Sequence, residues 1–211
     1  MTAAGNITIR GRAAAIANVN INGNVVTTGS FNIDSSGAQT ATNVNIDGVS
    51  ASGIVVRGVN VGLGGNLTAT AGSVHVLGAT TLQSNVVLTS SGLAAHFVRI
   101  DGAINGGFNL ESQSGLGQTH FVGVIGGVTP LANLLVRAGG YNYIYQNITV
   151  TGTVDWKSGD TANAGQDVIL VLSGKTITAG TSIILEADSV SVNQLTQLFA
   201  PLKSVINNGN P

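Results

Sequence analysis

The chain has 211 residues, of which only 8% are Asp, Glu, Lys or Arg, and its formal net charge is −1. A chain without a basic patch cannot neutralise a phosphate backbone, so nucleic-acid binding is not expected. No segment of about 20 apolar residues is available, so a membrane-spanning helix is excluded. Cysteine is absent, which excludes a disulfide scaffold, a thiol nucleophile and a thiolate metal site.

The amino terminus has no recognisable export signal. The opening MTAAGNITIRG lacks the apolar core of a secretory signal peptide. Met1 is therefore expected to begin either a cytosolic protein or an expressed fragment of a longer one, and we favour the fragment. The lack of cysteine also suits a secreted protein, because such a chain crosses an envelope without forming disulfides.

Short segments of alternating apolar and polar residues follow, and nearly all of them end in Gly or Asn. Examples in chain order are NITIRG at 6–11, NVNIDG at 43–48, NLTATAG at 66–72, HFVRIDG at 96–102, QNITVTG at 146–152 and SIILEAD at 182–188. Alternation with a period of two predicts β-strands. Many short strands separated by turn residues predict an all-β fold.

A sequence repeat indicates how these strands are arranged. An Asn followed by Leu or Val, with a Gly several residues later, recurs at Asn66, Asn85, Asn109 and Asn133, at spacings of 19, 24 and 24 residues. Seven of the twenty residues at 96–115 also recur 24 positions later. Fixed periods of this length are typical of proteins whose units stack on their neighbours. We therefore predict a β-solenoid over residues 1–192, with roughly eight or nine coils.

Stacking of similar coils explains the unusual composition. Neighbouring strands lie about 4.8 Å apart, so like charges at equivalent outward positions repel, whereas Asn, Thr and Ser form hydrogen-bonded ladders. The spacing of 24 residues predicts two structural ladders, His96 over His120 and Asn109 over Asn133. Gly or Asn at the corners supplies a positive φ or a close approach without a Cβ atom.

The last stretch of the chain has a different pattern. From Asn193 to Asn207 the apolar residues fall at helical spacing, and the two asparagines are placed to begin and end a helix. Pro201 is expected to kink it. We predict a short helical cap and tail over residues 193–211, which covers the open end of the solenoid. The alternative is a linker to a further domain of a longer protein.

Three phrases carry a family resemblance: GGNLTATAGSVHVLGATTL at 64–82, FVRIDGAINGGFNLESQSG at 97–115 and HFVGVIGGVTPLANLLVRAGG at 120–140. They resemble the repeat region of large secreted bacterial adhesins of the filamentous-haemagglutinin type. The likeness is strongest from Val74 to Gly140, is looser from Asn6 to Gly72, and fades after Tyr141, where aromatic residues appear. The resemblance implies a right-handed parallel β-helix, exported and held at the cell surface, that acts by contact with hosts, surfaces or neighbouring cells.

One polar loop is a candidate metal site. The segment VDWKSGDTANAGQD contains Asp155, Asp160 and Asp167, and Ca²⁺ prefers several oxygen ligands on a flexible loop. Their spacing matches neither an EF-hand nor a calcium-binding nonapeptide repeat, so a solvated turn is the preferred interpretation. No other cofactor is predicted. Trp156, within the same segment, is interpreted as a hydrophobic lid or a contact residue.

The residues do not define an active site, because no set of acids or bases is placed together and the repeat explains the paired histidines. We therefore expect a non-enzymatic structural or adhesive segment that is secreted or at the cell surface, and its partner is a host or neighbouring-cell surface, glycan or protein. One alternative is a self-assembling subunit of an extracellular filament. Another is a β-helix protein that binds or degrades a polysaccharide.

Overall fold

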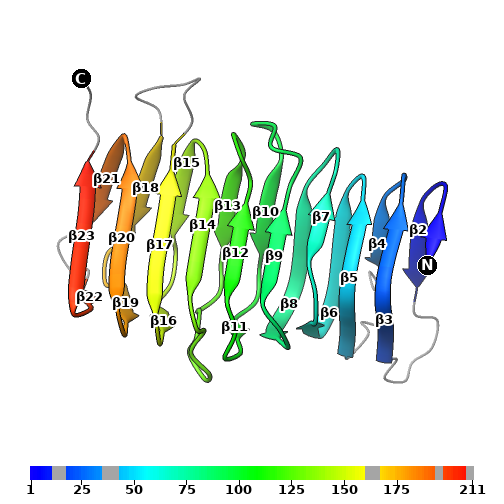
Figure 1. Cartoon of the computed structure of the whole chain (residues 1–211), viewed down its shortest axis with the longest axis horizontal. Helices are drawn as coiled ribbons and strands as arrows, with labels where there is room; N and C mark the ends of the chain where they lie inside the picture. The colour runs from blue at the N-terminus through cyan, green and yellow to red at the C-terminus, as the bar shows by residue number, and fades with distance from the viewer. Residues whose placement is uncertain (11–17, 35–42, 160–166, 193–196, 208–211) are drawn as a thin grey trace.

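The computed structural model describes residues 1–10, 18–34, 43–159, 167–192 and 197–207. They form an all-β parallel β-solenoid of at least seven turns. The coils follow one another along a straight rod, with the two termini at opposite ends (Figure 1). Every pairing between the described strands is parallel, so each strand hydrogen-bonds to its equivalents in the coils before and after it.

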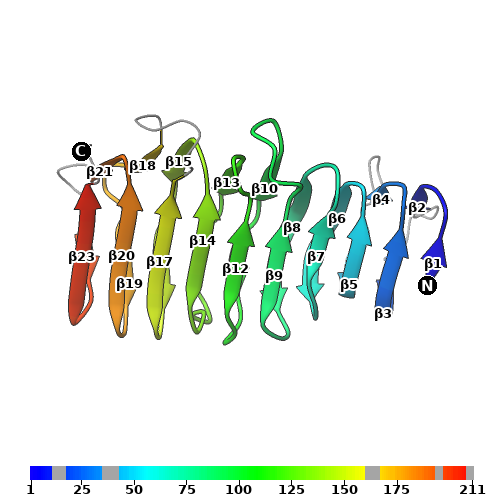
Figure 2. The ribbon, with the colours of Figure 1, turned by 45° about the horizontal axis from the view of Figure 1, so that its top comes forward.

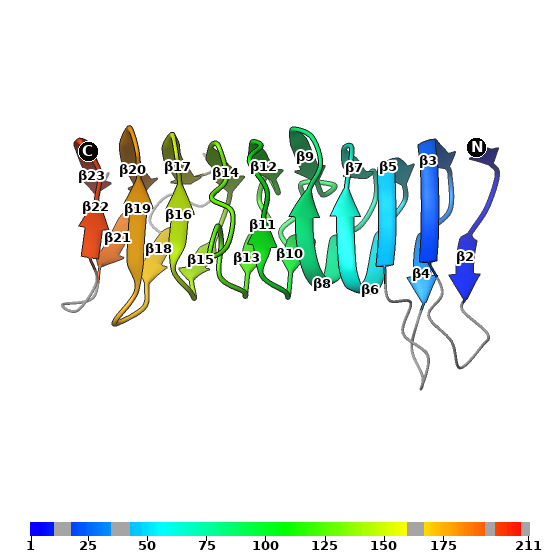
Figure 3. The same ribbon diagram turned by 90° about the horizontal axis from the view of Figure 1, so that it is seen from below.

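Three sheets run along the rod, and Figure 2 and Figure 3 show how each coil contributes to them. Sheet 1 contains, in stacking order, β1 (Thr2–Ala3), the second part of β3 (Asn18–Thr27), the second part of β5 (Asn43–Ala51), β7 (Leu67–Ala69), β9 (Val86–Thr89), β12 (Leu110–Gln113), β14 (Leu134–Ala138), β17 (Thr153–Ser158), β20 (Ser182–Ala187) and β23 (Leu202–Asn207).

Sheet 2 contains β2 (Ile7–Arg10), β4 (Phe31–Asp34), the first parts of β6 (Ile54–Leu63) and β8 (Val74–Leu82), β10 (Phe97–Ile100), β13 (Gln118–Phe121), β15 (Tyr141–Ile144), β18 (Val168–Val171) and β21 (Ser189–Val192). Sheet 3 contains the first parts of β3 and β5, the second parts of β6 and β8, β11 (Ile104–Asn105), β16 (Ile148–Val150), β19 (Thr176–Ala179) and β22 (Gln197–Phe199).

The core is a set of apolar stacks parallel to the rod axis. One stack in sheet 2 passes through Ile9, Ile33, Val56, Val76, Ile100 and Phe121. All of these except Ile9 are at most 3% exposed. Alternation within each strand places the intervening polar residues on the outside, because successive side chains of a strand point to opposite faces.

The corners need glycine for two reasons. A Cβ atom on Gly65 would overlap the backbone carbonyl oxygen of Asp47 in the preceding coil, so only glycine permits that close approach. Gly92 has a φ of 79°, a conformation that other residues adopt at a cost. Both uses follow the expectation from the sequence.

The predicted helical cap is not present in the described residues. The part of segment 193–207 that the structure describes forms β22 and β23, which pair in parallel with β19 and β20, and residues 193–196 lie outside the described residues. Strand pairing satisfies the backbone groups at the edges of β19 and β20, which a helix would leave without partners. Pro201 interrupts the helical pattern and separates the two strands. The solenoid strands therefore continue beyond residue 192.

Candidate contact surfaces

Asparagine side chains at the coil corners hold successive coils together. The Nδ2 atom of Asn133 donates a hydrogen bond of 2.8 Å to Oδ1 of Asn109, as the spacing of 24 residues predicts. The backbone amide of Asn109 in turn donates to Oδ1 of Asn85, and that of Thr153 donates to Oδ1 of Asn133. The recurring asparagine is thus a structural ladder between coils.

Introducing two aspartates into this ladder is expected to destabilise the fold. In Asn109→Asp the carboxylate still accepts the bond from Asn133, so the single change should have a small effect. In the double variant Asn109→Asp, Asn133→Asp, two carboxylates lie directly above each other, and we expect a coupling energy of about 1–2 kcal/mol. Urea unfolding of the four proteins of the cycle measures it. Strict additivity, as expected for the distant pair Asn32→Asp and Asn133→Asp, would contradict the stacking.

The predicted histidine ladder has a different register. The strand pairing places His120 opposite Arg99, and Arg99 opposite His75. His96 does not take part, since it precedes β10, where its backbone amide donates to the carbonyl of Leu93 and its Nδ1 lies 2.5 Å from Oγ of Ser91. Equivalent outward positions of sheet 2 are therefore 75, 99 and 120, and the expected stacking of His96 on His120 is replaced by this row.

Asp101 binds two side chains of this row, His75 and Arg99. One carboxylate oxygen of Asp101 lies 2.8 Å from Nε2 of His75, and the other accepts a bond of 2.5 Å from Nε of Arg99. Burial alone would raise the pKa of Asp101, but the hydrogen bonds from His75 and Arg99 outweigh it and lower that pKa below its ordinary value of 3.8. The guanidinium of Arg99 therefore has a carboxylate partner throughout the neutral range.

His120 remains uncharged more readily than an ordinary histidine. Burial lowers its pKa below the usual 6.5, and the nearby Arg99 lowers it further, while Asp101 acts in the opposite direction. Its Nε2 donates to Oε1 of Gln118 at 2.9 Å. At neutral pH the side chain is therefore an aromatic ring without charge.

The lowered pKa of His120 predicts a loss of stability in mild acid. Below about pH 6.5 the unfolded chain binds a proton at this residue before the folded chain does, so the free energy of unfolding falls as the pH falls. Asp101 acts in the same direction, but only near and below pH 3.8. Urea midpoints at pH 7.5 and 5.5 should differ less in His120→Gln than in the wild-type chain. An equal difference would show that His120 does not contribute.

Two amide ladders lie side by side on the outer face of sheet 3, and together with Gln83 we call them the amide face. One row contains Asn18, Asn43 and Asn60, and the other contains Asn20 and Asn45, which the side chain of Gln83 contacts. Within the rows Asn43 donates to Asn18, Asn60 to Asn43, and Asn45 to Asn20, at 2.9–3.1 Å. Nε2 of Gln83 donates to Oδ1 of Asn45 at 3.0 Å, across Gly62. A Cβ atom on Gly62 would overlap both side chains, so the glycine permits this contact and leaves a groove of about 440 Å³.

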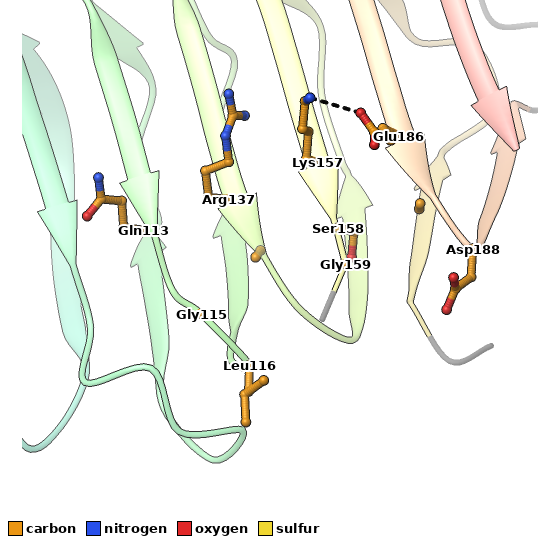
Figure 4. Close-up of a pocket in the computed structure, with 11 residues that line it drawn as sticks. Gln113, Gly115, Leu116, Arg137, Lys157, Ser158, Gly159, Glu186 and Asp188 are labelled. Atoms are coloured by element: carbon orange, nitrogen blue, oxygen red, sulfur yellow. Dashed lines mark ion pairs between the residues drawn. The ribbon is translucent and has the colours of Figure 1, made fainter. Parts of the chain in front are cut away.

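A second groove, of about 580 Å³, lies where the strands of sheet 1 end (Figure 4). Its charged row follows the strand register from Gln113 to Arg137, Lys157 and Glu186. Lys157 forms an ion pair with Glu186 at 2.9 Å, and Arg137 binds Asp155 at 2.6 Å. The charges of this row are thus balanced by partners within the fold.

The three calcium candidates are not brought together by the described part of the chain. Oδ2 of Asp155 accepts the bond from Arg137, whereas Oδ1 of Asp167 accepts a bond of 2.5 Å from the backbone amide of Gly140. Asp160 lies outside the described residues. Among the residues that the structure describes, no group of three potential ligands is found.

Because two of the calcium candidates, Asp155 and Asp167, accept structural hydrogen bonds, addition of calcium or of a chelator is expected to leave the melting temperature of the chain unchanged. A rise in the melting temperature with calcium would contradict this interpretation.

Trp156 is part of the core. It points inward from β17, stacks between Val136 and Leu185 of the adjacent coils, and is 1% exposed. The interpretation of this residue as a hydrophobic lid or a contact residue is therefore corrected, since it is buried in the core.

Comparison with protein-family models, with curated proteins and with solved structures gives no match. The structure therefore supports a β-solenoid of repeated coils, without assigning it to a family. In the described ranges, no helix has the length and apolar character required to cross a membrane.

Proposed function

We propose that this chain is a non-enzymatic, adhesive segment of a secreted or cell-surface bacterial protein, a right-handed β-helix of the filamentous-haemagglutinin type. The observation that carries the proposal is the amide face. Its side chains are held in place by one another, so that donors and acceptors are presented to solvent in a fixed arrangement.

The chemistry of this face suits contact with another surface. Each amide group has two donor hydrogens and an oxygen with two lone pairs, and one ladder bond uses only part of this capacity. The remaining groups of Asn18, Asn20 and Asn60, which are exposed, are available to a partner. Because the ladder already restricts the side chains, binding costs little additional conformational entropy.

The self-stacked scaffold explains why such a face remains rigid. Backbone hydrogen bonds run along the rod through all three sheets, and the apolar stacks fill its interior. A rigid rod separates its attachment point from its contact surface, which is the mechanical requirement of a long surface adhesin. The polar outer rows avoid charge repulsion between coils.

Adhesion is tested with polystyrene beads coated with the full chain. The beads are applied to cultured epithelial monolayers and to immobilised bacteria, and retention under flow is counted. We expect retention on at least one surface and a several-fold decrease for Asn43→Ala, Asn45→Ala. The control Thr68→Ala, Thr89→Ala changes two outward residues of sheet 1 and should keep full retention. Beads that are not retained on any surface would contradict the proposal.

Light scattering of the purified chain in solution, without beads, tests the filament alternative. A fixed particle size by light scattering over a wide concentration range is expected for an adhesive segment. Growth of the scattering with concentration would instead support a self-assembling subunit.

A further inference from the structure

Aromatic side chains form a continuous row on the outer face of sheet 2, and we call this row the aromatic strip: His75, Phe97, His120, Tyr145 and Tyr143. Neighbouring ring centroids are 6.0, 6.5, 6.4 and 5.6 Å apart in that order. The rings come from β8, β10, β13 and the segment around β15, four successive coils of the rod (Figure 1). The row therefore runs along the rod axis.

The strip concentrates a scarce residue type. Phe, Trp and Tyr make up only 4% of the chain, and Phe31, Phe121 and Trp156 are buried in the core. The side chains of the strip are partly exposed, and Tyr141 beside them is 51% exposed. On β15, Asn142 and Ile144 point inward, so Tyr141 and Tyr143 point outward. The core does not require these tyrosines.

The strip presents ring planes and neutral polar groups together. The planes of Tyr143 and Tyr145 are inclined by 33°, and those of His120 and Tyr145 by 40°, so these three rings have related orientations. Phe97 meets His75 and His120 edge-on, at 79° and 68°. Within the described part of the chain, the hydroxyl groups of Tyr141, Tyr143 and Tyr145 have no hydrogen-bond partner. The strip thus combines apolar ring surface with hydroxyl groups that remain to be satisfied.

The charges beside the strip are compensated. Arg99 and His75 both contact Asp101, and His120 contacts the uncharged amide of Gln118. A polyanion would find no free cation in these contacts, and a broad protein interface would require a larger apolar centre than a single row of rings. A sugar polymer matches the strip better, since its rings offer C–H faces to aromatic rings and its hydroxyl groups bond to tyrosine hydroxyls and amides.

We infer that the aromatic strip is a binding site for a neutral glycan chain lying along the rod. The site lies on a different sheet from the amide face, so the inference goes beyond the proposed adhesive function and can fail independently of it. Tyr143 and Tyr145 are the main ring contacts, and His120 extends the platform toward the preceding coil. Gln118 and the tyrosine hydroxyls supply the polar contacts.

Affinity electrophoresis of the full chain tests the inference. Native gels contain hydroxyethylcellulose, galactomannan or dextran as neutral probes, and heparin as an anionic one. We expect retardation by at least one neutral polysaccharide. The double variant Tyr143→Ala, Tyr145→Ala should bind that probe roughly tenfold more weakly, as expected for the loss of two ring contacts. Phe108→Ala, at an exposed aromatic away from the strip, should bind as the wild type does.

A second variant keeps the test informative if the alanine changes disturb folding. Tyr143→Phe, Tyr145→Phe retains both rings and removes both hydroxyls, so it should bind between the wild type and the alanine variant. Equal melting temperatures verify that the variants are folded. No retardation by the three neutral probes, retardation by heparin alone, or unchanged binding in the alanine variant would each overturn the inference.

Cell retention separates this site from the amide face. If retention of coated beads survives the tyrosine substitutions but is lost with Asn43→Ala, Asn45→Ala, the adhesive proposal stands and the glycan site is rejected as a contributor to it. If retention is instead lost with Tyr143→Ala, Tyr145→Ala and is removed by protease treatment of the cells but not by periodate, the strip binds a protein and the inference is overturned.

Discussion

Replacement of Asn142 with leucine is expected to destabilise the fold by about 3–5 kcal/mol, because it leaves buried backbone groups without partners. Asn142 is fully buried at the junction between β13 and β15. Its Oδ1 accepts a bond of 3.0 Å from the backbone amide of Thr119, and its Nδ2 donates to the carbonyl of Gly139 and to Oγ of Ser158. The side chain of Asn142 therefore supplies hydrogen bonds to backbone groups that strand pairing would otherwise satisfy.

The location of Asn142 explains this dependence. The structure divides sheet 2 here, and β15, β18 and β21 form a separate three-stranded ladder. Leucine has a similar size but offers neither an acceptor to Thr119 nor a donor to Gly139. Urea unfolding measures the loss, and Asn32→Leu serves as the control, since Asn32 is half-buried and has no hydrogen bond from its side chain among the described residues. Losses of equal size in the two variants would refute the role given to Asn142.

Asn142→Asp gives an independent check through pH. Aspartate keeps the acceptor for Thr119 but places a carboxylate among backbone oxygens, with no cation in the hydrogen-bond shell seen for Asn142. Its pKa should rise on folding, so the folded state binds a proton that the unfolded state has released. Measured against the wild-type chain at each pH, the variant should therefore become less destabilised as the pH falls from 7 toward 4. A difference from the wild type that stays constant or grows over this range would contradict the assignment.

The repeated coils were predictable because their physical cause is local. Alternation in segments such as NVNIDG sets which side chains face inward, and a Gly or Asn after each strand marks the corner. The recurrence of Asn109 at Asn133 predicts their contact correctly, since both lie at the entrance to sheet 1 strands that are paired 24 residues apart.

The register of sheet 2 could not be predicted from the same repeat. Seven residues, 90–96, connect β9 to β10, but only four, 114–117, connect β12 to β13. Ile104 pairs with Ile125, and the later corner at 127–133 is longer than the equivalent corner at 106–109 by the same three residues. Sheet 1 therefore returns to a spacing of 24, while Phe97 pairs with Gln118. The lengths of successive corners compensate each other, so identical residues such as His96 and His120 occupy different positions in their coils.

The contact surfaces depend on the register between strands of successive coils, which the sequence spacing alone does not determine. The amide face requires Asn18, Asn43 and Asn60 to share a row, although their spacings are 25 and 17 residues. The aromatic strip likewise joins residues of β8, β10 and β13, whose paired positions are 24 residues apart between β8 and β10 but 21 residues apart between β10 and β13. The helix predicted for the final residues is wrong because Leu198, Leu202 and Ile206 fit a helical period by chance, whereas pairing with the edges of β19 and β20 determines their structure.

Trp156→Ala is expected to be the most destabilising substitution in the core, at about 3–5 kcal/mol. The indole occupies an inward position of sheet 1 that holds Val136 in the preceding coil and Leu185 in the following one. Its ring meets Phe121 of sheet 2 edge-on, with centroids 6.0 Å apart. The residue therefore connects two sheets across the interior, and alanine would leave a cavity between them.

Phenylalanine at this position separates packing from polarity. Nε1 of Trp156 is buried with no acceptor among the described residues, which itself costs about 1–3 kcal/mol. Trp156→Phe removes that donor and keeps a ring against Phe121, so the lost volume is partly offset. We expect less than half the loss of the alanine variant, measured by urea unfolding of both. A phenylalanine variant as unstable as the alanine variant would contradict this account. It would show that Nε1 of Trp156 has a partner, and that ring packing alone does not determine how much Trp156 stabilises the fold.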